Sequence, residues 1–349
     1  MINGVKLKKA VYLLFFLIIS TLCIAEKNIK YDIVDAHVHY VDFVQNTAGI
    51  DKVINCMKYA NVSDSVLWGL PVTKIWGEYS KEQPIHHLSS ETRMYWDTKT
   101  DYLIATAYLN AKPEYQKRLH PFMCGFNGID KNSLDQVKRL IQTYPGLWQG
   151  IGEIFAHHDY ISYMTSGQIP RPDSAAYDML YKFAAKYDMP VVIHTNITSG
   201  DNPKPILLYQ FLNAVKKNPN TKFVWAHAGI SNDMYVPNLT EIISKRLAKY
   251  PNLHIDLSWV VWDYQIFRGG KLDKTWIPVI EKYPDRFLIG SDIVGYSMPR
   301  EIYKNIIRKY DILLNALTPK TAKKVAHDNF FTLLPKQKVI LKPEDRIQL

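Results

Sequence analysis

The sequence predicts an α/β fold, a (β/α)8 TIM barrel with an inserted loop after the second strand. Between residues 33 and 294, eight short apolar or β-branched runs recur about every 30 residues. Most are followed by a polar turn and a segment of helical periodicity, which is typical of parallel strands buried on both faces. Eight such units match a closed barrel, and an open doubly wound sheet is the alternative.

The predicted strands are the eight apolar runs themselves. They cover residues 33–39, 65–71, 120–126, 150–155, 190–195, 222–227, 253–259 and 286–292.

The helical half of the repeat is clearest over residues 173–187. Its apolar residues follow the i, i+3, i+4, i+7 spacing of a buried helix face. Asp173 is the predicted N-cap, and Pro190 lies beyond the predicted end. Similar helices are predicted over 206–218, 238–250 and 300–317.

The gap between the second and third strands is the longest in the chain. It leaves room for an insertion between Val72 and Asp101 that is polar and aromatic and contains His86. Because it follows a strand, the insertion is expected on the face of the barrel where active sites are built.

Residues 1–25 are typical of a secretory signal peptide. Lys6, Lys8 and Lys9 precede an apolar run over 10–24, and the segment contains no acid. An uncleaved anchor helix is the alternative, although the run is short for a membrane span of about 20 residues. We therefore expect a single barrel domain over 26–349, periplasmic or secreted, with no stable membrane insertion after the leader is removed.

Composition narrows the function classes. The net charge is +10, with three positive charges in the leader, and no run of five or six basic residues follows it, so a nucleic-acid partner is not expected. Three cysteines exclude a disulfide scaffold, although Cys56 and Cys124 could pair in an oxidising compartment. The expected partner is a small-molecule substrate, and a homo-oligomer is left open.

His37 and His39 lie at the carboxyl end of the first predicted strand. Side chains alternate along a strand, so both imidazoles are expected to point to the same side and could share one metal ion. A lone pair of this kind is a weak signal. Four further chemistry-bearing residues end other predicted strands: Glu153, His194, His227 and Asp292.

Such residues could also be unrelated polar groups that the backbone satisfies. Burying this many ionisable groups without an ion would cost several kcal/mol in desolvation, which favours a shared divalent metal. Nitrogen and carboxylate ligands without cysteine suit Zn²⁺ first, with manganese, iron or cobalt as alternatives.

The chain resembles the amidohydrolase superfamily, within its amidohydrolase-related branch (family 2) of TIM-barrel metal-dependent hydrolases. The resemblance covers roughly residues 31–335. It lies in Asp35-Ala36-His37-Val38-His39, Gly152-Glu153, His194, Ala226-His227-Ala228-Gly229, Gly290-Ser291-Asp292 and the closing segment 328–334.

The resemblance implies a role for each residue. His37, His39, His194 and Asp292 would hold the main metal, and His227 would be a second-site ligand or polarise the substrate. Glu153 stands where some relatives supply a carboxylated lysine, so one or two ions are compatible with the set. Asp292 would accept a proton from a water whose pKa the metal lowers to about 7, while His227 helps to stabilise the oxyanion.

Three residues outside the metal set are candidates for substrate binding. Trp259 and Arg268 flank an aromatic loop after the seventh strand, where Arg268 could meet a carboxylate bidentately and the rings could hold a planar acid. His157, followed by His158, comes after the fourth strand. The aromatic loop from Trp259 to Arg268 could equally be a lid packed on its own barrel.

Three functions remain open at this stage. The first is a hydrolase that cleaves an amide, ester or lactone with a metal-activated water. The second is a metal-dependent, non-oxidative decarboxylase of an aromatic or unsaturated carboxylic acid. The third is a non-catalytic exported barrel that binds a metal or ligand, although the full ligand set argues against it.

Overall fold

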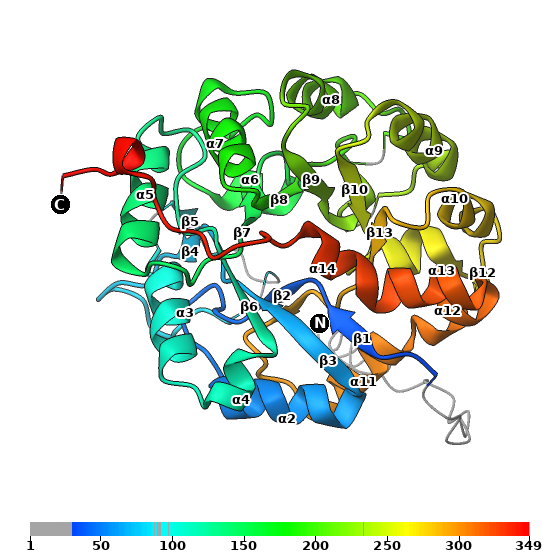
Figure 1. The fold of residues 1–349 in the computed structure, drawn as a ribbon, viewed down its shortest axis with the longest axis horizontal. Helices are drawn as coiled ribbons and strands as arrows, with labels where there is room; N and C mark the ends of the chain where they lie inside the picture. The colour runs from blue at the N-terminus through cyan, green and yellow to red at the C-terminus, as the bar shows by residue number, and fades with distance from the viewer. Residues whose placement is uncertain are drawn as a thin grey trace, which may run out of the picture. The chain divides into compact units, whose positions relative to one another are not determined.

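Eight parallel strands form the central sheet, arranged in the order in which they follow one another along the chain (Figure 1). The computed structural model describes residues 30–348 apart from 87, 89–91, 97, 201 and 233, so the predicted leader lies outside the described residues. The strands are β1 (Ile33–Asp35), β3 (Val62–Leu67), β6 (Leu119–Met123), β7 (Gly150–Phe155), β8 (Pro190–His194), β9 (Lys222–Trp225), β10 (Leu253–Asp256) and β13 (Phe287–Leu288).

The sheet closes on itself between its last and first strands. The Ala36 amide donates to the Ile289 carbonyl at 3.1 Å, and the Asp292 amide donates to the His37 carbonyl at 2.8 Å. Just beyond, β2 (Val38–His39) pairs in parallel with β14 (Ile293–Val294). The predicted (β/α)8 barrel is therefore confirmed, and the open doubly wound sheet is excluded.

Helices surround the strands as an outer layer (Figure 1). They are α2 (Ile50–Ala60), α3 (Thr100–Leu109), α4 (Pro113–Gln116), α5 (Ser133–Thr143), α6 (Asp159–Met164), α7 (Ala175–Lys186), α8 (Leu208–Lys217), α9 (Leu239–Lys249), α10 (Trp276–Lys282), α11 (Arg300–Arg308), α12 (Asp311–Ala316), α13 (Pro319–Lys323) and α14 (Asn329–Leu333). No helix within the described residues is long and apolar enough to cross a membrane.

Two helix predictions need correction. The N-cap of α7 is Ser174, whose hydroxyl accepts the Tyr177 amide, whereas Asp173 pairs with Arg171 at 3.0 Å. The predicted helix over 300–317 divides into α11 and α12. The chain turns between them because Tyr310 is drawn into the core, where its hydroxyl donates to the Leu257 carbonyl at 2.7 Å.

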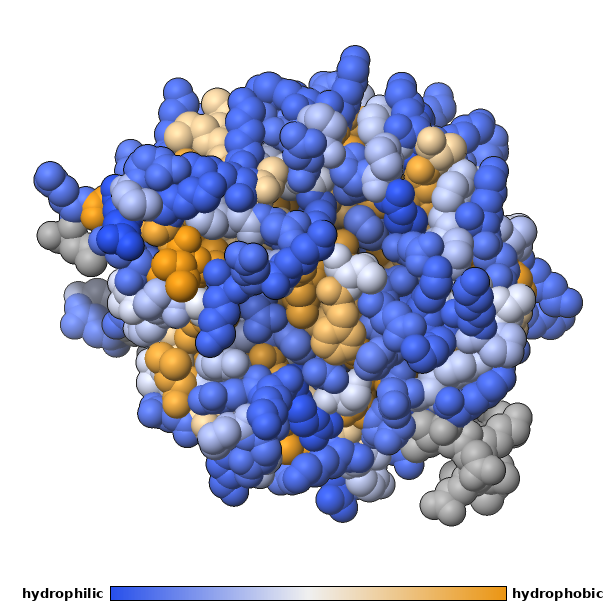
Figure 2. All heavy atoms as spheres, in the orientation of Figure 1, coloured by the Kyte–Doolittle hydropathy of each residue, from blue (hydrophilic) through white to orange (hydrophobic). Residues whose placement is uncertain are grey.

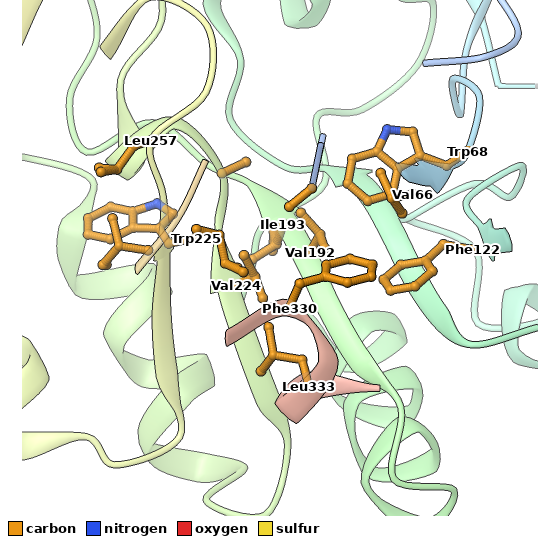
Figure 3. Packing of buried hydrophobic residues seen from close by; sticks show 14 of the residues in the cluster. Val66, Trp68, Phe122, Val192, Ile193, Val224, Trp225, Leu257, Phe330 and Leu333 are labelled. Atoms are coloured by element: carbon orange, nitrogen blue, oxygen red, sulfur yellow. The ribbon is translucent and has the colours of Figure 1, made fainter. Parts of the chain in front are cut away.

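The amino-terminal end of the barrel is closed by α14. Asn329 donates from its side-chain amide to the carbonyls of Pro284 and Phe287, at the start of β13. Figure 3 shows Phe330 and Leu333 packed beneath the strand residues Val192 and Val224. Because this end is filled by side chains, the opposite end of the barrel is the one available for a site.

Trp225 joins the sheet to the outer helices. Its side chain is fully buried, its ring lies 4.7 Å from that of Phe211 on α8, and its indole N–H donates to the Thr195 carbonyl at 2.8 Å (Figure 3). Truncation to alanine should cost about 3–5 kcal/mol of unfolding free energy, from the cavity left behind and the unpaired carbonyl. Urea denaturation checks this, with W76A as control. Trp76 is 56% exposed, so its loss should stay within about 0.5 kcal/mol.

The predicted insertion is present after β3. It contains β4 (Thr73–Lys74) and β5 (Met94–Tyr95), which form an antiparallel pair. Figure 2 shows one face of the molecule, where apolar residues lie as separate small groups among polar ones. Cys56 and Cys124 are both free and buried, so the open question of a disulfide between them is answered negatively in this structure.

Candidate metal centre

Most of the predicted strands end earlier than expected, and three of these early ends lead to a residue of the site. These three strands stop at Trp225, Asp256 and Leu288. His227, Trp259 and Asp292 follow in left-handed backbone conformations, with φ of 52°, 58° and 54°. An extended strand cannot continue through such residues, and non-glycine residues of this kind gather at functional sites.

The six predicted ligands meet at the carboxyl end of the barrel. His37 and His39 come from the first strand region, Glu153 from β7, His194 from the end of β8, His227 from the turn after β9, and Asp292 from between β13 and β14. The side chains of the first five are at most 3% exposed, and that of Asp292 is 10% exposed.

Glu153 stands between two pairs of histidines. Its Oε2 faces Nε2 of His37 and His39, at 3.5 and 3.3 Å. Its Oε1 faces Nδ1 of His194 at 3.1 Å and Nε2 of His227 at 3.3 Å. A carboxylate whose two oxygens face separate nitrogen pairs has the form of a bridging ligand.

Asp292 completes the first group and reaches toward the second. Its Oδ1 lies 3.3 Å from Nε2 of His37 and 3.2 Å from Nε2 of His39. Its Oδ2 lies 3.7 Å from Nε2 of His227. The predicted grouping of His194 with His37, His39 and Asp292 is therefore not the one that the geometry favours, because His194 faces the other oxygen of Glu153.

Three histidines are oriented by partners on Nδ1. His37 Nδ1 lies 2.7 Å from Asp256 Oδ2, His39 Nδ1 lies 2.6 Å from the Gly69 carbonyl, and His227 Nδ1 contacts Ser258. A carbonyl or carboxylate can only accept, so Nδ1 of His37 and of His39 carries the proton. Each Nε2 then turns its lone pair to the cluster, as second-sphere partners of metal ligands do.

His194 is oriented in the opposite way. Its Nε2 lies 3.2 Å from Asn196 Oδ1 and 3.1 Å from Ser231 Oγ, and Ser231 donates to the same Asn196 oxygen at 2.6 Å. Since the Asn196 oxygen accepts, the proton of His194 belongs on Nε2. Nδ1 is then left with its lone pair toward Glu153.

Asn196→Ala is expected to weaken divalent-metal binding by about 10- to 100-fold, because without the Asn196 oxygen the tautomer and ring orientation of His194 are no longer fixed. Titration with Zn²⁺ against a competing chelator measures the change. N202A is the matched control. Asn202 lies six residues further along the same loop, and among the described contacts none joins it to the ligands. Equal affinities in the two variants would show that the Asn196 contact does not orient a ligand.

The charges of the cluster call for a cation. Burial lowers the pKa of His37, but the carboxylates of Asp292, Glu153 and Asp256 raise it well above its usual value. Burial also lowers the pKa of His39, but Asp292 and Glu153 outweigh this effect and raise the pKa to about 9. Burial raises the pKa of Glu153, yet His37, His194 and His227 bring it well below its ordinary range. Three buried carboxylates thus require positive charge, which protons or a divalent ion can supply.

The residues fit a metal ion better than a set of hydrogen bonds. Nε2 of His37 is buried without a hydrogen-bond partner in the described structure, although two carboxylate oxygens lie close to it. Two groups bring their ligand atoms within 4.8 Å of one another, namely His37 with His39 and Asp292, and His37 with Glu153 and His227. Ligands at about 2.0–2.2 Å from an ion stand about 3–3.5 Å apart, which is close to the spacings seen.

The cluster forms the floor of a cavity of about 860 Å³. His39, Glu153, His194, His227 and Asp292 line it together with Trp259. The ring centroid of Trp259 lies 5.1 Å from that of His227 and 6.1 Å from that of His194. The structure thus places Trp259 at the predicted position beside the ligands.

Arg268 and His157 do not line this cavity. Arg268 lies in a short antiparallel pair, β11 (Phe267–Arg268) with β12 (Lys271–Leu272), and its guanidinium stacks on Tyr235 at 3.7 Å. His157 Nε2 contacts Gln210 Oε1 at 2.8 Å, and it is the neighbouring His158 that faces the cavity, stacked on His194.

Sequence reasoning missed Asp256 and Lys309. Asp256 is the last residue of β10, so the rule that located the other ligands could have found it. Lys309 follows α11 and lines the cavity, but a lysine at the end of a helix carries no sequence signal that separates it from a solvated one.

Comparisons with known proteins agree with the fold. A protein-family model described as amidohydrolase matches residues 161–330. No curated protein matches the chain in sequence.

Solved structures share the barrel at low sequence identity. An amidohydrolase from Burkholderia multivorans with bound zinc is 11% identical, with a TM-score of 0.56 over 87% of this chain and 100% of the other. A TIM-barrel protein from Bordetella bronchiseptica is 14% identical, with a TM-score of 0.52 over 86% and 98%. A dihydroorotase from Campylobacter jejuni is 13% identical, with a TM-score of 0.50 over 86% and 82%.

The family match over residues 161–330, the closed barrel and the candidate ligands gathered at its carboxyl end lead to one conclusion: the chain is a TIM-barrel enzyme that is similar to the amidohydrolases.

Proposed function

We propose that the protein is a metal-dependent hydrolase that cleaves an amide, ester or lactone of a small molecule with water. The observation that carries the proposal is the position of Glu153 between two histidine pairs, with Asp292 beside both pairs and open to the cavity. Histidines and carboxylates without cysteine are ligands that suit Zn²⁺.

The two faces of Glu153 support a pair of ions. His37, His39 and Asp292 would hold one ion, His194 and His227 the other, and Glu153 would bridge them. Bound ions of this kind polarise a carbonyl oxygen and lower the pKa of water toward neutrality.

The residues of the chain supply the remaining steps. Asp292 is the group placed to accept the proton of the attacking water and to return it to the leaving group, because it lines the cavity and remains charged. Burial raises the pKa of Asp292, but His37 and His227 bring it below its usual value. Nε2 of His227 faces the same space, and Trp259 covers one side of it.

The decarboxylase alternative uses the same cavity, since apolar walls beside metal ligands also fit an aromatic acid. The two reactions differ in what attacks: a hydrolase needs Asp292 to take a proton from water, whereas a decarboxylase releases carbon dioxide without hydrolysis. The non-catalytic barrel is not retained, because the family match and the full ligand set belong to an enzyme.

A substrate panel tests the proposal. Zn²⁺-loaded protein is expected to hydrolyse a member of a panel of lactones, esters, amides and aromatic acids, and removal of metal by chelation should abolish turnover until Zn²⁺ is restored. Products are followed by mass spectrometry and carbon dioxide release. Release of carbon dioxide from an aromatic acid, with no hydrolysis product, would show that the protein is a lyase and not a hydrolase. Turnover that survives full removal of the metal would contradict both.

We also propose that the enzyme acts outside the cytoplasm. The support is the basic and apolar pattern of residues 1–25. Mass spectrometry of the amino terminus of the exported protein tests this, with cleavage after residue 25 as the expected result.

A further inference from the structure

Lys309 lies on the wall of the cavity that the metal cluster floors. It is the residue at the carboxyl end of α11, and it lines the same space as Glu153 and Asp292. Among the described residues that line the cavity it is the one lysine, and no arginine joins it there. A fixed positive charge and the metal ligands therefore share one substrate space.

The ammonium group of Lys309 is largely withdrawn from solvent and poorly paired. Its side chain is 22% exposed, and within the described part of the chain its Nζ makes no hydrogen bond. The nearest carboxylate is that of Asp263, at the limit of 4.0 Å, on a side chain that is 70% exposed. An exposed partner at this distance compensates little of the cost of withdrawing a charge from water.

The ammonium group is held in place by aromatic rings. Nζ lies 5.7 Å from the ring centroid of Trp262 and 5.6 Å from that of Tyr310. Burial lowers the pKa of Lys309, while Asp263 and Asp292 oppose the change, so the cavity acid Asp292 acts on it electrostatically. Cation–π contacts position the ammonium group but leave its N–H hydrogen-bond donors unused.

Apolar side chains form much of the remaining cavity wall, together with polar ones such as Asn232 and Ser297. Phe43, Leu70, Phe155, Ile161, Ile293 and Met298 line the cavity. A ligand in this space meets metal ligands, hydrocarbon side chains and a cation with unused hydrogen-bond donors. A pocket with apolar walls and a few placed polar groups selects a ligand of matching pattern.

We propose that Lys309 binds a carboxylate of a partly apolar substrate whose scissile group reaches the metal cluster. The inference deepens the proposed function and rests on it. One carboxylate matches the site better than a phosphate does, because a single ammonium balances one negative charge, and Asp263 and Asp292 disfavour a dianion. Lys309 would then perform the carboxylate binding that the sequence suggested for Arg268.

Bifunctional probes separate the two ends of the site. We would use monohydroxamates of the straight-chain dicarboxylic acids from succinic to suberic, and the matching compounds in which the free acid is a primary amide. The hydroxamate is the metal-binding group in both series. The acid and the amide therefore differ only in the group that Lys309 would contact. Binding to Zn²⁺-loaded protein is measured by calorimetry, and no turnover is needed.

The expected result has two parts. At the chain length that fits, the acid should bind the wild-type protein about 10- to 100-fold more tightly than its amide, as a charge-assisted hydrogen bond allows. K309M should reduce this preference to about threefold or less and leave the binding of the amide unchanged, since methionine keeps the packing against Trp262.

Control variants keep the test decisive. K304M removes a lysine of the same helix that lies 5.1 Å from the ring of Tyr59 and does not line the cavity, and it should keep the full preference. K309R should retain a preference for the acid. Binding of the amide reports in each variant that the barrel and its metal are intact.

The outcomes distinguish this inference from the proposed function. Equal binding of acid and amide to the wild-type protein at every length, or an acid preference that survives in K309M, would overturn the role of Lys309 and leave the metal centre standing. Failure of every hydroxamate, acid or amide, to bind would overturn the metal centre and this inference with it.

Discussion

Asp292→Asn is expected to abolish turnover while the barrel stays folded. Asparagine keeps the shape of the side chain and an oxygen near His37 and His39, but it cannot accept a proton and carries no charge. Loss of a positioned general base costs about 10²- to 10⁴-fold in rate, and weaker metal binding adds to the loss. The measurement is kcat on the substrate that the panel identifies, with circular dichroism as the test of folding.

The matched control for this variant is Asp285→Asn. Asp285 lies at the opposite end of the same strand region, its side chain is 62% exposed, and its partner is Lys324 on the surface. We expect wild-type turnover from this variant. If D292N also turned over at the wild-type rate with its metal bound, the assignment of Asp292 as the proton acceptor would be refuted.

Glu153→Gln is expected to have the largest effect on metal binding. The glutamine amide offers one acceptor oxygen in place of two, so it cannot face both histidine pairs as Glu153 does. Zinc affinity should fall by more than about a hundredfold, since loss of second-sphere contacts alone costs about 10- to 100-fold. Competition with a chromogenic chelator measures the affinity.

The control for Glu153 is Glu241→Gln on α9. Glu241 is 59% exposed and pairs with Lys245 one helical turn away, so its loss should not change zinc affinity. Unchanged zinc affinity in E153Q would show that Glu153 does not hold the ions, and the two-ion arrangement would then have no bridge.

Much of the barrel was predictable because its signals are local. The strand Gly150–Phe155 has the predicted bounds, and α7 lies within the predicted helix, since a buried run and a 3.6-residue period are written in the sequence itself. The early ends of β9, β10 and β13 were not predictable. They depend on left-handed residues such as His227 and Asp292, whose conformations the surrounding barrel imposes.

That the six candidate residues come together was predictable, but their arrangement was not. Strand ends converge in a barrel, so the six ligands could be named, yet the use of Nδ1 by His194 depends on Asn196 and Ser231, which no strand-end pattern indicates. Arg268 does not line the cavity, because it lies in a short antiparallel pair and stacks on Tyr235, a contact that no sequence pattern indicates. Lys309 was overlooked because tertiary packing on Trp262 contributes to its burial.

Elemental analysis of the purified protein measures how many ions the cluster holds. After expression with Zn²⁺ and gentle removal of loose metal, we expect about two ions per chain in the wild-type protein and at most about one in E153Q. A value near zero in the folded wild-type protein would refute the metal centre, because His37, His39, His194, His227, Glu153 and Asp292 would then share their space without a cation.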